Sequence, residues 1–178
     1  MALLYRKTIR DAIVAVLSAA GTGFNARLTA SAVAYGIEPF SIDFTGADQN
    51  FALCKIDPQN IELCSLLNFP AGCLYTDEAA DSGLPRGITF SGEVIACLEF
   101  YLRQREGVEG FDSESLLDAT EDAAMSAINS PAVSWPINST ISVIFARKNS
   151  AERDHLIQLG DGFGQRIRMR ILFEVKVP

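Results

Sequence analysis

The most regular pattern along the chain is an alternation of apolar and polar residues over positions 165–177. One set of alternate positions is apolar: Ile167, Met169, Ile171, Phe173, Val175 and Val177. The other set is polar apart from Leu172, and its basic members are Arg166, Arg168, Arg170 and Lys176. A period of two is typical of a β-strand with one buried face. We therefore predict a long strand here, central or near-central in a sheet that is covered on one side.

A second long alternation covers residues 87–105 and predicts another strand. Its apolar positions are Ile88, Phe90, Val94, Ala96, Leu98, Phe100 and Leu102. The opposite positions include Glu93 and Glu99, and Gly92 allows a bend or a bulge partway along. If this strand neighbours the last one, the two glutamates are expected to face the arginine row.

Two segments show the spacing of an amphipathic helix. Residues 5–20 carry an apolar stripe at i, i+4, i+7 and i+8, and Gly21 and Gly23 end the segment. Residues 113–129 follow an N-cap at Asp112 or Ser113 and carry an alanine-rich stripe. Between them, residues 25–35 fit either a helix or a strand, and the pattern leaves the choice open.

The remaining segments are shorter or less regular. We predict strands over residues 51–56 and 140–146, a helical turn within 61–69 and an extended stretch over 73–76. Residues 77–86, 106–110 and 133–138 are expected to form loops or turns, and residues 147–165 a protruding loop. This order predicts an α+β fold, mainly antiparallel, with helices on one face.

The composition narrows the class of protein. A length of 178 residues fits a single domain over 1–178, with an inserted or extended region at about 60–86. A net charge of −7 argues against wrapping nucleic acid by bulk electrostatics. No stretch resembles a membrane span or a signal peptide, so a cytoplasmic protein with reduced, mostly buried cysteines is expected.

The chemically reactive residues do not form a recognisable site. The single histidine, His155, lies between acids in the expected 147–165 loop, and the four cysteines lack metal-ligand spacing. The acids Asp77, Glu78 and Asp81 lack the pattern of a calcium loop. Neither a nucleophile motif nor a complete dinucleotide fingerprint is present. We therefore expect no enzyme, no metal and no cofactor.

The charged positions on the two long strands leave two interpretations open. Glu93 and Glu99 can pair with the arginines across the sheet, or the polar face can form a contact between subunits. Arg6 and Arg10, in the first helix, are either solvated or in contact with an acidic partner. The candidate interface set is therefore Arg6, Arg10, Glu93, Glu99, Arg166, Arg168, Arg170 and Lys176.

Taken together, the layout resembles the tail terminator and tail completion proteins of long-tailed bacteriophages. The resemblance lies in the helix around residues 6–13, the strand 94–101, the acid-capped helix start at 112–117 and the closing strand 167–177. It is a pattern of elements over about two-thirds of the chain, without a diagnostic motif. Region 60–86 is longer than such subunits usually need.

The resemblance implies a structural protein of the virion neck, assembled in the host cytoplasm. Subunits of that family form a ring, usually a hexamer, that caps the tail tube and docks to the head-side connector, or stopper. The expected partners are copies of the chain, the tube protein and the connector, with DNA passing through the lumen without specific binding. Three alternatives remain: another neck ring, a small enzyme using loops 77–86 and 147–164, or a module that binds a ligand or peptide on the polar sheet face.

Overall fold

The computed structural model describes residues 4–76, 90–103, 113–129, 142–159 and 162–177. The helices are α1 (Leu4–Leu17), α2 (Phe24–Tyr35), α3 (Ile61–Ser65) and α4 (Ser113–Ile128). The strands are β1 (Phe51–Ala52), β2 (Ala71–Thr76), β3 (Phe90–Arg103), β4 (Ser142–Leu159) and β5 (Gly162–Val177). The expected loops and turns at 77–86, 106–110 and 133–138 lie outside the described residues.

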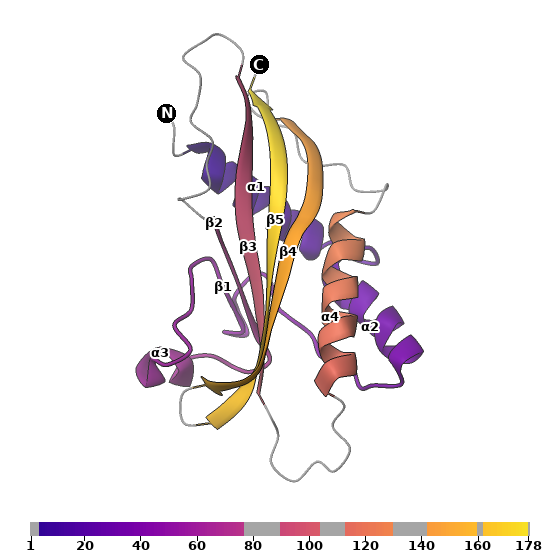
Figure 1. Cartoon of the computed structure of the whole chain (residues 1–178), viewed down its shortest axis with the longest axis vertical. Coiled ribbons are helices and arrows are strands. Elements are labelled where there is room, and N and C mark those ends of the chain that lie inside the picture. Colours follow the sequence, from indigo (N-terminus) through magenta and orange to yellow (C-terminus); the bar gives the residue numbers. More distant parts are fainter. Residues whose placement is uncertain (1–3, 77–89, 104–112, 130–141, 160–161, 178) are drawn as a thin grey trace.

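The strands form one sheet in the order β1-β2-β3-β5-β4. Strand β1 pairs with β2 in parallel, and every other described pairing is antiparallel. The three longest strands, β3, β5 and β4, lie side by side along the long axis of the molecule (Figure 1). Because β5 lies between β3 and β4, the predicted near-central position of the last strand is confirmed, and so is the α+β class.

One face of the sheet carries the main hydrophobic core. Strand β3 contributes Leu98 and Phe100, and β5 contributes Ile167 and Met169, at the alternate positions that the sequence pattern assigned to the buried face. Helices α1, α2 and α4 supply the opposing apolar side chains. Phe24 of α2 stacks on Phe100 with 4.6 Å between ring centroids. The stack fixes α2 against the C-terminal part of β3.

The open choice for residues 25–35 is resolved as a helix. Phe24, Leu28 and Ala32 are buried at helical spacing, and Gly36 closes the helix in a left-handed conformation with φ of 68°. At Gly23, an added Cβ would lie 2.4 Å from the carbonyl oxygen of Leu17. This close approach allows α1 and α2 to follow each other with a very short connection.

Helix α4 packs closely because its buried side is built from small residues. Ala119, Ala123, Ala124 and Ala127 are fully buried, and of these Ala124 and Ala127 belonged to the predicted stripe. On its outer side, Arg153 of β4 contacts the acids of α4: Nη1 lies 2.6 Å from Asp118 Oδ1, and Nη2 lies 2.7 Å from Glu121 Oε2. These ion pairs join β4 to the helical layer.

Two expectations about the extent of strands are wrong. Residues 147–159, expected in a protruding loop, belong to strand β4, which pairs with β5 through its whole length. Register shifts at three places in β4 interrupt the alternation that would have revealed the strand. The strand expected over 51–56 is confined to Phe51–Ala52.

The second face of the sheet is also partly covered, whereas the sequence led us to expect cover on one side only. A smaller cluster gathers Ile56, Cys64, Cys73, Tyr101 and Leu159, with α3 and its flanking residues packed over the sheet. The region around residues 60–76, expected to be an insertion, therefore supplies both an integral strand, β2, and this cover. Within the described residues, no helix is long and apolar enough to cross a membrane.

Candidate functional site

The polar face of the sheet carries two transverse rows of charged and hydroxyl side chains. The register aligns Glu99 of β3, Arg168 of β5 and Glu152 of β4 in one row. The next row aligns Tyr101, Arg166 and Asp154. Because residues two apart on a strand share a face, both rows point to the same side of the sheet.

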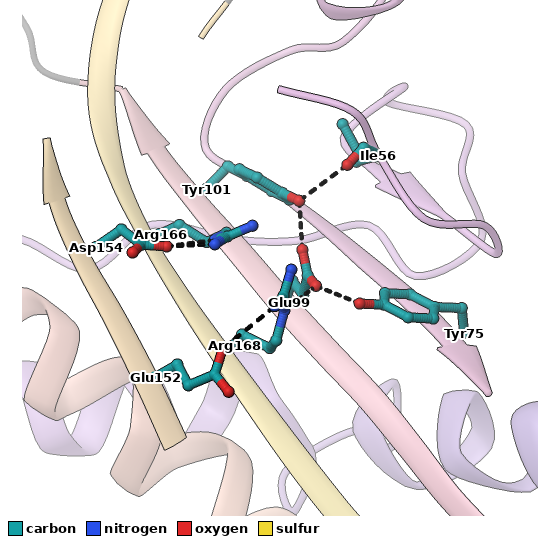
Figure 2. Close-up of polar contacts among 8 residues, drawn as sticks. All are labelled: Ile56, Tyr75, Glu99, Tyr101, Glu152, Asp154, Arg166 and Arg168. Carbon is teal, nitrogen blue, oxygen red and sulfur yellow. Dashed lines mark hydrogen bonds and ion pairs between the residues drawn. The ribbon is translucent and has the colours of Figure 1, made fainter. Parts of the chain in front are cut away.

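Glu99 is the centre of the first row and is completely buried. Its Oε1 accepts hydrogen bonds from the hydroxyl of Tyr75 and from Nε of Arg168, each at 2.5 Å. Its Oε2 accepts a hydrogen bond from the hydroxyl of Tyr101, which also lies 3.3 Å from the carbonyl oxygen of Ile56 (Figure 2). Three strands therefore converge on one carboxylate.

The surroundings of Glu99 keep it ionised. Burial by itself would raise the pKa of Glu99, but the hydrogen bonds from Tyr101, Tyr75 and Arg168 outweigh burial and hold the pKa below its ordinary value. Burial and the same carboxylate raise the pKa of both tyrosines, which remain hydroxyl donors. A buried carboxylate with an arginine and two phenols is typical of a structural ion pair, since both of its oxygens already accept hydrogen bonds.

Both rows are more exposed at their β4 ends than at their β3 ends. Nε of Arg166 donates to Oδ2 of Asp154 at 2.7 Å, and the Arg166 side chain is only 18% exposed. Arg168 extends its Nη1 to Glu152 Oε2 at 3.2 Å, and Glu152 is half exposed. The two guanidinium groups are thus anchored on one side by carboxylates of β4 (Figure 2).

A pocket of about 690 Å³ lies where these rows meet the segment before α3. One wall is formed by residues 55–59, and the other by Asp154, Ile157 and Gln158 of β4 with Arg166 and Arg168 of β5. The volume lies within the range of about 300–1,000 Å³ found for ligand pockets. The pocket is therefore the best candidate site that the described residues offer.

The structure brings together only part of the predicted interface set. Glu99, Arg166 and Arg168 lie in the two rows. The expected pairing of a glutamate with an arginine is observed for Glu99 and Arg168, whereas Arg166 pairs with Asp154 of β4. Arg170 lies on the same face, opposite Cys97. A role of these residues between subunits remains a prediction.

The other members of the set lie elsewhere. The expectation that Glu93 faces the arginines is wrong, because the register places it opposite Glu174. Lys176 lies between Ser91 and Ser142 in the sheet. Arg10 is half-buried on α1, which packs against the opposite face. The side chains of Arg6, Glu93 and Lys176 lie outside the described residues.

The sequence analysis did not identify three groups of residues that contribute to the two rows and the pocket. Glu152 and Asp154 were placed in a loop, although they occupy alternate positions of β4 and continue the two rows. Tyr75 was seen only as part of an extended stretch. Lys55 was placed in the strand expected over 51–56, whereas it belongs to the irregular segment after β1. The alternation of Glu152 and Asp154 was the one available clue.

The described residues contain no group of three or more side chains suited to hold a metal ion. Cys64, Cys73 and Cys97 are free and buried as predicted, whereas Cys54 is exposed. Burial and the charge of Glu99 raise the pKa of Cys73 to about 12, so it is a poor nucleophile. His155 lies on β4 and not in a loop, and its side chain is outside the described residues.

Comparison with known families finds no family model that matches the chain, and comparison with curated proteins finds no match.

Proposed function

We propose that this protein is a structural component of the neck of a tailed bacteriophage, similar to a tail terminator. In this role its subunits form a ring that caps the tail tube and joins it to the head-side connector. The chain acts by assembly geometry and not by catalysis. The ring is hexameric, as is usual in the family that the sequence layout resembles.

The observation that carries the proposal is a pair of exposed apolar patches on opposite sides of the subunit. The α2 patch is the surface around Val33, whose exposed fraction is 80%. In and beside α3, the exposed apolar side chains are Leu53, Ile61 and Leu66, with exposed fractions of 51%, 56% and 66%, and we call this region the α3 patch. Helices α2 and α3 lie on opposite faces of the sheet (Figure 1).

Two different patches on opposite sides favour a head-to-tail contact. In such a contact the α2 patch of one subunit covers the α3 patch of the next, and the repeat closes into a ring if the rotation permits. A two-fold dimer would instead use one patch twice. Ring formation would also place the long outer strand β4 among neighbours, which protects a sheet edge from indiscriminate pairing.

The charge of the chain agrees with passage of DNA through the ring. A net charge of −7 gives the phosphate backbone few sites to bind, so DNA can slide without being held. The proposed partners are further copies of the chain, the tube protein and the connector, or stopper. The proposed location is the virion neck after assembly in the host cytoplasm.

The three alternatives differ in how they relate to the structure. Another neck component, such as a head-completion or connector ring, has the same assembly logic and differs in its neighbours in the virion. The enzyme alternative relied on loops at 77–86 and 147–164, and residues 147–159 belong to β4. A binding module on the polar face is the alternative that the pocket supports.

Native mass spectrometry and negative-stain imaging of the purified protein test the proposal. We expect rings, and we expect that Val33→Asp alone, or Ile61→Asp with Leu66→Asp, yields monomers. Mixing the two variants tests the head-to-tail arrangement, because one intact pair of patches remains and should form heterodimers. Ser18→Glu, an exposed change at the end of α1, serves as the control and should leave the rings intact.

A wild-type protein that stays monomeric at micromolar concentration in both measurements would contradict the proposal. Homodimers that neither variant disrupts would contradict the head-to-tail arrangement. The melting temperature of each variant distinguishes lost assembly from lost folding.

A further inference from the structure

The pocket on the polar face has a surplus of hydrogen-bond donors. Three cations line it, Lys55, Arg166 and Arg168, together with two carboxylates, Asp57 and Asp154. Within the described part of the chain, Lys55 has no ionic or hydrogen-bonded partner. Nη1 of Arg166 and Nη2 of Arg168 likewise contact no acceptor there. The other guanidinium nitrogens bind Asp154 in the case of Arg166, and Glu99 and Glu152 in the case of Arg168.

Each nearby carboxylate already accepts at least one hydrogen bond within the protein. Oδ2 of Asp154 accepts two hydrogen bonds from Arg166. Oδ1 of Asp57 accepts the backbone N–H of Gln59 at 3.1 Å. Glu99, beneath the pocket, is buried and uses both of its oxygens. These carboxylates are thus bonded to other groups of the protein, and none of the contacts above engages Lys55, Nη1 of Arg166 or Nη2 of Arg168.

The low exposure of the two arginines makes their unpaired nitrogens good candidates for binding a ligand. The side chains of Arg166 and Arg168 are only 18% and 20% exposed, so their guanidinium groups are largely removed from water. Hydrogen bonds from such groups to a carboxylate are stronger than bonds between neutral groups. Arginine also presents its donors in a planar fork that matches the two oxygens of a carboxylate.

We propose that this pocket binds a single carboxylate side chain of a partner protein. The free edges of Arg166 and Arg168 hold the two oxygens, and Lys55 closes the site from the facing wall. Ile56 and Ile157 contact the apolar stem of the acidic side chain. The site goes beyond the assembly proposal and does not depend on ring formation.

The flanking acids favour a single carboxylate over a phosphate chain. Asp57 and Asp154 oppose a group of higher charge, and the net charge of −7 repels a polyanion as a whole. The competing occupant is a nucleic acid, and the experiment must distinguish its binding from that of a protein carboxylate.

The test is an NMR titration that follows the side-chain Nε–H signals of Arg166 and Arg168. The probe is N-acetylglutamate methylamide, and its neutral counterpart N-acetylglutamine methylamide is the matched control. We expect saturable shifts of both signals with the acidic probe and none with the neutral one. Inorganic phosphate and a short single-stranded oligonucleotide form the other arms, and both should bind more weakly than the acidic probe.

Two variants locate the site. Lys55→Gln removes an exposed side chain without other partners, and we expect it to weaken binding about threefold, as for an exposed ion pair. Arg166→Gln should weaken binding about tenfold or more, as for a charged hydrogen bond. Lys7→Gln on α1 removes the same charge elsewhere and should leave the affinity unchanged.

Tighter binding of the oligonucleotide would overturn the proposal in favour of nucleic acid. Equal shifts with the neutral probe, or an affinity that Lys55→Gln does not alter, would overturn it as well. Because Lys55→Gln disturbs no internal contact, this result stands even if Arg166→Gln fails to fold.

Discussion

On one face of the sheet, β3 and β5 contribute apolar side chains to a core shared with α1, α2 and α4. On the other face, the same two strands present Glu99, Arg166 and Arg168. The first face is held by apolar burial, which has no preferred direction. The second is held by hydrogen bonds, whose partners and angles are specific. One pair of strands therefore combines a packing surface that tolerates changes of apolar side chains with a polar surface that depends on single contacts.

Removing a large side chain from the apolar face should have the largest effect. Phe100 is fully buried and stacks on Phe24. We expect Phe100→Ala to lower the free energy of unfolding by about 3–5 kcal/mol, through lost burial and a residual cavity. Urea denaturation measures the change. Phe100→Leu keeps most of the volume and should cost clearly less; equal losses would show that the site is not packed as described.

Breaking the polar face at its centre should have the next largest effect. Arg168→Met leaves Glu99 buried with only the two tyrosines, and we expect a loss of about 2–3 kcal/mol, the value for a hydrogen bond to a charged group. The double variant Glu99→Met, Arg168→Met removes both charges and should be more stable than Arg168→Met alone. Denaturation of the three proteins forms a cycle. A double variant less stable than the single one would contradict a charge-pair role.

Arg153 provides an exception to the comparison, because it is a cation on the apolar face. Its side chain is 29% exposed and contacts Asp118 and Glu121 of α4. We expect Arg153→Met to lower the free energy of unfolding by about 1 kcal/mol, since partly exposed ion pairs contribute little. The thermal melting point and hydrogen exchange of α4 measure it. A loss as large as that of Arg168→Met would mean that β4 depends on α4 as strongly as on β5.

The smallest effect is expected from mild acidification. The pKa of Glu99 is lowered by folding, so its contribution is fully present above the ordinary carboxyl pKa of about 4.3 and is lost as pH falls through the lower folded value. The stability difference between wild type and Glu99→Gln should therefore be constant from pH 7 to 5 and shrink below pH 4. Urea denaturation at each pH tests this. A difference that grows on acidification would show that the folded pKa is raised instead.

The parts of the fold that were predictable are those where one physical rule governs many consecutive residues. The faces of β3 and β5 followed from their alternation, and α4 followed from its cap and its alanine stripe. The pairing of Glu99 with Arg168 was open as one of two interpretations, since the facing positions were visible but the strand order was not. The pocket was not predictable, because its walls come from an irregular segment and from β4.

Strand β4 shows why prediction failed where it did. Its register shifts break the period of two, and its charged residues resemble a solvated loop. In the folded chain, Ala151 packs on the core, Arg153 contacts α4, and Glu152 and Asp154 point to the polar face. Each of these placements depends on a partner far away in the sequence.

The amino-acid sequence by itself determined which strand faces are apolar, where two helices begin and end, and that charged groups of opposite sign occupy alternate positions of the long strands. These features depend on local periodicity, which neighbouring residues along the chain define. Only the tertiary structure decided the strand order, the helical state of α2, the cover over the polar face and the pocket beside Arg166. Those features depend on contacts between distant segments, whose energies outweigh weak local preferences and are absent from any short stretch of sequence.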